Sequence, residues 1–96
     1  MSGKRRAVRV RVRGRVQHVG FRWFVARTAR DLAVAGWVRN VEDGAVEVAA
    51  EGTVEQVAQL LTALRRGPSQ AAVQSVEIEE RPLSATADHT AFEILP

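Results

Sequence analysis

The stretch GRVQHVGFR, residues 14–22, holds the residues best suited to chemistry. Gly14 and Gly20 let the backbone approach a ligand closely, and successive N–H groups of such a loop can turn toward one anion. Arg22 falls in the first turn of the helix that the following residues predict. Free N–H groups and the helix dipole attract negative charge there, so an arginine opposes the dipole unless an anion lies between them.

The physical properties of this loop alone allow two interpretations: it is either an ordinary strand-to-helix turn or an anion site. It lacks the Lys-Ser/Thr pair of a Walker A loop and the three glycines of a dinucleotide fingerprint. Charge favours anions, because ten of the 14 Lys and Arg residues lie between Lys4 and Arg30, while every acidic residue lies from Asp31 onward. A cationic segment attracts phosphates, nucleic acids or acidic lipid head groups alike.

Hydrophobic periodicity predicts the elements on either side of the loop. Before it, valines at 8, 10 and 12 alternate with arginines at 9, 11 and 13, which indicates a strand with one buried face and Arg9, Arg11 and Arg13 on the other. After it, apolar residues recur at helical spacing from Phe21 to Leu32. We expect Gly36 to end this helix in the left-handed conformation.

Residues 37–52 predict a hairpin whose loop, Glu42 to Gly44, suits a three-residue turn with a bulge at Gly44. That loop length puts Val38 and Asn40 on the face of the apolar residues of the second strand, whereas a two-residue turn would put Arg39 there. Asn40 is then the polar side chain of an otherwise apolar face.

The remaining chain predicts a helix and two strands. Thr53 and Gln56 have the spacing of a capping box, and Gly67-Pro68 ends the helix. A strand over 73–81 stops at Pro82, a polar loop containing His89 follows, and residues 92–94 form a short last strand. This order predicts an α+β ferredoxin-like sandwich, βαββαβ with a short extra C-terminal strand, in which two helices cover one face of an antiparallel sheet.

Composition excludes several classes of protein. The chain has no cysteine, and His18 and His89 lack the spacing of a zinc site, so we expect no metal site. No apolar run approaches the roughly 20 residues of a membrane span, and no apolar segment of a signal peptide follows the basic start. We expect residues 1–96 to form a single domain with about residues 1–6 as a flexible basic N-terminus, in a cytoplasmic monomer without membrane contact.

GRVQHVGFR at 14–22, with GWVRN at 36–40, resembles the acylphosphatase family, whose signatures are Gly-x-Val-Gln-Gly-Val-x-Phe-Arg and Gly-Trp-Val-x-Asn. The similarity covers nearly the whole chain, through Gly44, Val46-Glu47, Gly52, Gly67-Pro68 and Val73. It implies the same sandwich fold and a cofactor-free enzyme that hydrolyses acyl phosphates to a carboxylate and inorganic phosphate, with phosphate as an inhibitor.

The resemblance also implies roles for residues. Arg22 would hold the phosphate, and Asn40 would orient the attacking water. The amides from Gln17 to Arg22, those of Gln17, His18, Val19, Gly20, Phe21 and Arg22, would cradle the phosphate. The family usually has glycine at the position of His18, where a positive φ would cost histidine about 1 kcal/mol. We interpret His18 as a tolerated loop residue.

The implied reaction agrees with the residue types present. An acyl phosphate expels a carboxylate whose conjugate acid has a pKa of about 4, so its departure requires neither a general acid nor a metal. Positioning a water in line and stabilising the anionic phosphoryl group are sufficient. A phosphate oxygen of the substrate can accept the proton of the water.

Two other functions use the same fold. RNA-recognition modules also have it, and a row of arginines on an open sheet face suits phosphates, but such modules stack bases on aromatic residues that the first strand lacks. Nucleic-acid binding is therefore a distant second hypothesis. The third is a non-catalytic domain of the kind that begins larger hydrogenase-maturation proteins. Trp23, Phe24 and Trp37 are interpreted as packing residues, and His89 as solvated.

Overall fold

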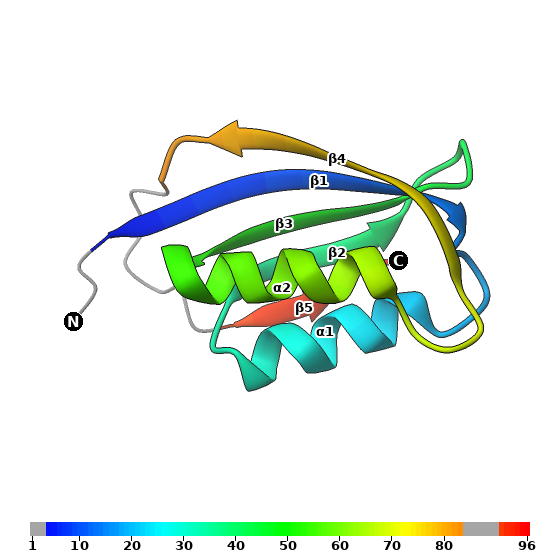
Figure 1. The fold of residues 1–96 in the computed structure, drawn as a ribbon, viewed down its shortest axis with the longest axis horizontal. Coiled ribbons are helices and arrows are strands. Elements are labelled where there is room, and N and C mark those ends of the chain that lie inside the picture. The colour runs from blue at the N-terminus through cyan, green and yellow to red at the C-terminus, as the bar shows by residue number, and fades with distance from the viewer. Residues whose placement is uncertain (1–3, 84–90) are drawn as a thin grey trace.

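The computed structural model describes residues 4–83 and 91–96 as a five-stranded sheet with two helices on one face (Figure 1). The elements in chain order are β1 (Arg5–Arg15), α1 (Phe21–Asp31), β2 (Ala35–Asn40), β3 (Val46–Thr53), α2 (Val54–Arg66), β4 (Ala72–Arg81) and β5 (Phe92–Ile94). The strand order is β4-β1-β3-β2-β5. The predicted βαββαβ sandwich with an extra strand is confirmed.

One detail of the sheet differs from the prediction. The first four strands pair antiparallel, but β5 pairs with β2 in parallel, so the sheet is mixed. The reason is topological. β1 is antiparallel to both β3 and β4, and β2 is antiparallel to β3, so β2 runs opposite to β4; β5 runs opposite to β4 as well and therefore lies parallel to β2.

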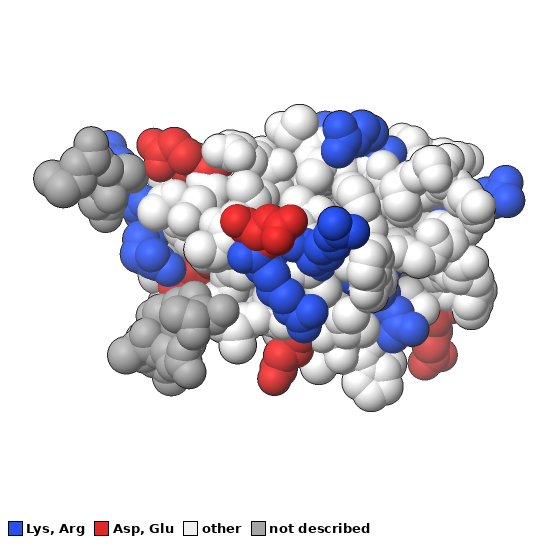
Figure 2. All heavy atoms as spheres, turned by 90° about the horizontal axis from the view of Figure 1, so that it is seen from below, with Lys and Arg blue, Asp and Glu red and all other residues white. Residues whose placement is uncertain are grey.

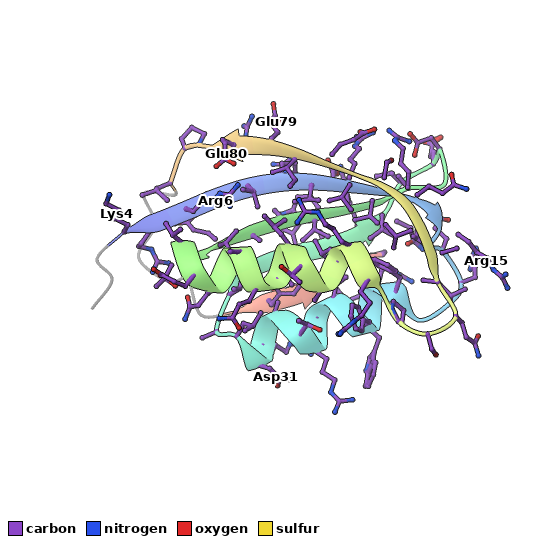
Figure 3. All side chains as sticks on the ribbon, viewed as in Figure 1. Lys4, Arg6, Arg15, Asp31, Glu79 and Glu80 are labelled. Carbon is purple, nitrogen blue, oxygen red and sulfur yellow. The ribbon has the colours of Figure 1, made fainter. Side chains whose placement is uncertain are left out.

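β1 begins earlier than the sequence indicates. Arg5 and Arg6 were expected in a flexible N-terminus, yet they pair with Thr53 and Gly52 of β3. Arg6, labelled with its partner in Figure 3, also donates from Nε to Glu80 Oε1 on β4 at 3.1 Å. Strand pairing on one side and an ion pair on the other therefore extend β1 toward the N-terminus.

The core lies between the sheet and the helices. The valines of β1 at positions 8, 10 and 12 are at most 2% exposed and pack with buried residues of both helices, among them Phe21, Val25, Leu60 and Leu64. The arginines that alternate with these valines lie on the other face of the sheet, as the strand period predicts.

The helix ends follow from local hydrogen bonds. In α2, Gln56 N donates to Thr53 Oγ1 at 3.1 Å and Thr53 N to Gln56 Oε1 at 2.9 Å, which confirms the capping box. In α1 the expectation for Gly36 is wrong. The helix ends at Asp31, and Ala33 takes the left-handed conformation with φ 59°, while Val34 N donates to Ala29 O at 2.8 Å.

Gly36 instead lies inside β2, with φ 143°. A Cβ atom there would lie 1.8 Å from the carbonyl oxygen of Ala49 on β3. The glycine is thus required by the close approach of two strands.

The hairpin between β2 and β3 has the predicted geometry. Val41 N donates to Ala45 O at 3.0 Å, and Gly44, with φ 95°, completes the loop. Val38 lies opposite Val48 and Asn40 opposite Val46, so Asn40 does lie on the buried face.

Two other observations complete the fold. Residues 84–90, which include His89 and most of the predicted polar loop, lie outside the described residues. Among the helices of the described ranges, none is long and apolar enough to cross a membrane.

Candidate active site

The loop leaves the sheet through an irregularity in β1. The register with β4 shifts between Arg13 and Gly14, and a Cβ atom on Gly14 would lie 2.2 Å from Ala72 O. Gly14 has φ 127°, a conformation that other residues rarely adopt. The glycine therefore lets the chain pass β4 and bend toward the N-terminus of α1.

The loop backbone has the conformation of an anion nest. His18 (φ 64°) and Gly20 (φ 76°) are both left-handed, and Gly20 is the N-cap residue of α1. No acceptor within the described part of the chain receives the N–H groups of residues 17 to 22. Several free donors therefore meet at a helix N-terminus, where the dipole adds positive potential. His18 is exposed and bears the expected strain of about 1 kcal/mol.

Arg22 is half-buried in the first turn of α1 and is held from the far end of the chain. Its Nη1 donates to Leu95 O at 2.7 Å, and Leu95 N donates to Val38 O at 2.8 Å. A guanidinium has five N–H donors, so the remaining ones can meet a ligand. The segment after β5 thus orients Arg22, a role that the sequence did not suggest.

Asn40 is the last residue of β2, and its side-chain oxygen is unusual. Oδ1 is buried and receives no hydrogen bond from any described residue. A buried acceptor without a donor costs about 1–3 kcal/mol, and such groups in native structures frequently serve a ligand or a water.

Arg22 and Asn40 line the same cavity, which has a volume of about 250 Å³. Its lining residues are Val16, His18, Gly20, Phe21, Arg22, Trp23, Asn40 and Ile94. The structure therefore brings together four of the six predicted loop residues and the predicted asparagine. Phe21 is 1% exposed and belongs to the core, so it contributes mainly its backbone.

Gln17 and Val19 do not line this cavity. Val19 packs against the core, and Gln17 Nε2 donates to Val41 O at 2.8 Å and to Ala45 O at 2.9 Å. Gln17 thereby ties the loop to the β2–β3 hairpin, next to Asn40. This clamp fixes the distance between the loop and Asn40, and it was not recognised because it depends on a tertiary contact.

The arginine row of β1 lies beside carboxylates on the open face of the sheet. Arg9, Arg11 and Arg39 surround Glu47, which is 4% exposed; Arg39 Nε donates to Glu47 Oε1 at 2.8 Å. Burial alone would raise the pKa of Glu47, but the Arg39 hydrogen bond and the three positive charges lower it below its ordinary value.

Arg13, the last arginine of this row, is also paired with carboxylates. Arg13 Nη1 donates to Asp43 Oδ2 at 2.8 Å, and Arg13 Nε to Glu77 Oε2 at 3.2 Å. Hydrogen bonds from Arg13 and from Ala45 N–H hold the pKa of Asp43 below its usual range. Arginines paired with carboxylates in this way leave fewer free donors for the phosphates of a nucleic acid. Basic and acidic groups also lie near one another on another side of the molecule, the one seen from below in Figure 2.

The tryptophans occupy different surroundings. Trp37 lies on the open face, with the guanidinium carbons of Arg9 and Arg39 at 5.1 and 5.2 Å from its ring centroid. Trp23, by contrast, is 60% exposed and lines the cavity. Within the described ranges no group of three or more His, Asp or Glu residues could hold a metal ion.

Comparisons of the sequence and of the structure with known proteins identify acylphosphatases. The profile of the acylphosphatase family matches residues 8–94. The acylphosphatase of Syntrophotalea carbinolica is 51% identical over 72 residues, which are 75% of this chain and 78% of that protein. The crystal structure of acylphosphatase from Bacillus subtilis has a TM-score of 0.87 at 37% identity, covering 95% of this chain and 99% of that one. An acylphosphatase structure from Coxiella burnetii also gives 0.87, at 36% identity, and covers 99% and 100%.

Proposed function

The chain belongs to the acylphosphatase family, and from this premise we propose how its own residues divide the reaction. It is a hydrolase that cleaves acyl phosphates to a carboxylate and inorganic phosphate. The observation that carries the proposal is that Arg22 and the buried, unpartnered Asn40 Oδ1 line one small cavity.

The loop and Arg22 bind the phosphoryl group. The free N–H groups of residues 17 to 22 point from a nest at the N-terminus of α1, and Arg22 is oriented by Leu95 O. Although the side chains of Gln17 and Val19 lie elsewhere, their backbone N–H groups belong to this cradle. Fixed donors of this kind stabilise the charge on the equatorial phosphoryl oxygens without reorganisation during the reaction.

Asn40 positions the nucleophile. Its Oδ1 accepts a hydrogen bond from the water, which directs a lone pair of the water oxygen toward phosphorus. As the bond from phosphorus to the water oxygen forms, the bond to the bridging oxygen breaks and the carboxylate leaves with the electron pair. The proton of the water passes to a phosphate oxygen, so the products are a carboxylate and dihydrogen phosphate.

A carboxylate is a good leaving group, with a conjugate acid of pKa about 4. It requires no proton from the enzyme and no metal ion for its departure. We therefore propose that turnover is metal-independent and that ordinary alkyl phosphate esters, which expel a far stronger base, are not hydrolysed at a useful rate.

Steady-state kinetics of the purified protein with benzoyl phosphate test this function. We expect hydrolysis to persist in excess EDTA, and inorganic phosphate to inhibit competitively, because it occupies the loop and Arg22. Inhibition should weaken as salt is raised, since salt screens the charges. An alkyl phosphate ester is the control substrate and should give negligible turnover.

Two results would contradict the proposal. Loss of activity in EDTA with recovery on added Mg²⁺ or Zn²⁺ would show that a metal takes part. Purely noncompetitive inhibition by phosphate would place the phosphate site away from the substrate.

A further inference from the structure

Two of the large exposed apolar side chains lie at the mouth of the candidate active site. In the described ranges four such side chains stand out, Trp23, Val54, Leu83 and Ile94. Trp23 is 60% exposed and Ile94 40% exposed, and both line the 250 Å³ cavity with Arg22 and Asn40. Exposed apolar groups that gather at a cavity with convergent polar groups are typical of a ligand site.

The polar and apolar parts of the cavity come from different residues of the loop, α1 and β5. The phosphate-binding donors lie on the loop and on Arg22, whereas the apolar wall combines the indole of Trp23, on α1, with Ile94, on β5. Arg22 Nη1 donates to Leu95 O, the residue after Ile94, and so fixes this wall relative to the phosphate site.

Trp23 is also held in place. The guanidinium carbon of Arg27, one helical turn further along α1, lies 5.3 Å from the centroid of its ring. A cation over one face of an indole restricts the orientation of the ring. The exposed tryptophan is thus a pre-oriented flat surface, and a rigid aromatic residue binds a planar group at a low cost in conformational entropy.

We infer that Trp23 and Ile94 form an acyl subsite, so that this enzyme prefers acyl phosphates whose acyl group is flat and apolar, such as an aroyl group, over acetyl phosphate. The inference rests on the proposed function, because it assumes that the phosphoryl group of the substrate lies at Arg22. The cavity is smaller than the roughly 300–1,000 Å³ of sites for drug-sized ligands, which favours a single ring.

Contact with the acyl group is present in both the bound substrate and the transition state. An interaction of equal strength in both lowers KM without raising kcat. The subsite should therefore lower KM for an aroyl phosphate and leave kcat unchanged. It should not affect the turnover of a substrate that has a methyl group in place of the ring.

The test compares kcat/KM for benzoyl phosphate with kcat/KM for acetyl phosphate in the wild type, Trp23→Ala and Trp37→Ala. We expect the benzoyl-to-acetyl ratio to fall about tenfold in Trp23→Ala through a raised KM, and to stay within twofold in Trp37→Ala. Trp37 is the matched control, since it is the same residue type on the open face of the sheet. Trp23→Phe should keep most of the preference, and Ile94→Ala should lose a smaller part of it.

The ratio does not depend on the active fraction of a preparation, because both substrates are measured with the same protein. An unchanged ratio in Trp23→Ala, or an equal fall in Trp37→Ala, overturns the acyl subsite while leaving the proposed function intact.

A second measurement is independent of turnover. Phenacylphosphonate and acetonylphosphonate replace the bridging oxygen of the two substrates by carbon and cannot be hydrolysed in the same way. Calorimetry should show that the wild type binds phenacylphosphonate more tightly than acetonylphosphonate. This difference in affinity should be lost in Trp23→Ala and kept in Trp37→Ala. If the wild type hydrolysed neither phosphate yet showed this advantage, the proposed function would fail and the subsite would stand. Equal binding of the two phosphonates by the wild type would overturn the subsite.

Discussion

Arg22 donates one guanidinium N–H group to the carbonyl oxygen of Leu95, whereas Asn40 Oδ1 receives no donor from the described part of the chain. This difference at the residue scale separates their roles. In the proposed mechanism Arg22 is anchored at the phosphate, so it interacts with the substrate throughout the reaction. Asn40 offers an acceptor that a water can satisfy and an acyl phosphate dianion, which has no O–H group, cannot. The asparagine therefore contributes chiefly when the water attacks.

Substituting the two residues should separate these roles. We expect Asn40→Ala to lower kcat at least about 100-fold, or roughly 2.7 kcal/mol, while KM and phosphate inhibition stay almost unchanged. Arg22→Ala should damage both kcat and KM, because it removes contacts to the bound substrate as well. Steady-state kinetics with benzoyl phosphate give both values.

Circular dichroism and thermal unfolding provide the control for Asn40→Ala. The substitution removes a buried acceptor without a protein donor, so the free energy of unfolding should not fall appreciably. A folded Asn40→Ala protein that retained most of its kcat would remove Asn40 from the mechanism.

The sequence indicated residues that the structure places in one cavity, but it did not indicate what holds them in place. Arg22 and Asn40 follow from the two motifs together with the hairpin register, which places Asn40 on the buried face. The Gln17 clamp was missed, and Trp23, which was interpreted as a core or partly exposed packing residue, lines the cavity. Both depend on which side of a loop or helix faces a distant segment, and periodicity in one element does not contain that information.

At the scale of elements, the left-handed position after α1 is not occupied by the residue that the sequence suggests. A glycine five residues after the helix resembles a helix terminator, but the left-handed position is filled by Ala33. Gly36 serves a different purpose, the close contact between β2 and Ala49 of β3. Glycine signals a special backbone position without saying whether the cause is a helix end or a neighbouring strand.

Stability measurements distinguish these causes. Ala33→Gly should raise the free energy of unfolding by up to about 1 kcal/mol, since it relieves a left-handed alanine on the surface. Gly36→Ala should lower it by about 3 kcal/mol or more, because a methyl group would add a backbone clash to the strain of a positive φ. Urea unfolding measures both changes.

Gly44→Ala is the matched control for Gly36→Ala. Gly44 also has a positive φ, 95°, but a Cβ atom there would meet nothing within 4 Å. Its substitution should cost only the conformational strain of about 1–2 kcal/mol. A Gly36→Ala protein as stable as Gly44→Ala would contradict the strand-contact explanation.

The pairing between strands was also only partly predictable from the sequence. The hairpin register was predictable because the loop length fixes it. The parallel pairing of β5 was not, because three residues carry too little periodicity to indicate a direction.

At the scale of the whole molecule, the fold removes a charge asymmetry that the sequence shows. The basic first third and the acidic remainder are separate in sequence, but the sheet order places β1 between β3 and β4. Arginines of β1 thereby meet Glu47 of β3, Asp43 of the hairpin loop and Glu77 of β4. These ion pairs connect neighbouring strands and the hairpin loop across the open face of the sheet.

Glu47 is the centre of this arrangement and gives the stability a pH dependence. Its pKa is lowered in the folded protein, so the stabilisation is present above the pKa of the unfolded chain, about 4.3, and is lost as pH falls through the lower folded value. The free energy of unfolding should thus decrease below about pH 5, where the carboxylate starts to bind protons in the unfolded chain.

Glu47→Gln should remove this dependence. At pH 7 we expect it to lower the free energy of unfolding by about 1.5–3 kcal/mol, because the buried charged hydrogen bond from Arg39 is lost and three arginines keep no common partner. The wild type and the variant should converge only as pH falls through the lowered folded pKa of Glu47, where the carboxylate is protonated in the folded protein as well. The control is Glu79→Gln on the same face, where the side chain is 66% exposed and its pairing with Arg81 should contribute less than about 1 kcal/mol. Urea unfolding of the three proteins across this pH range measures the difference, and parallel curves for the wild type and Glu47→Gln would show that the arginine row is stabilised by something other than Glu47.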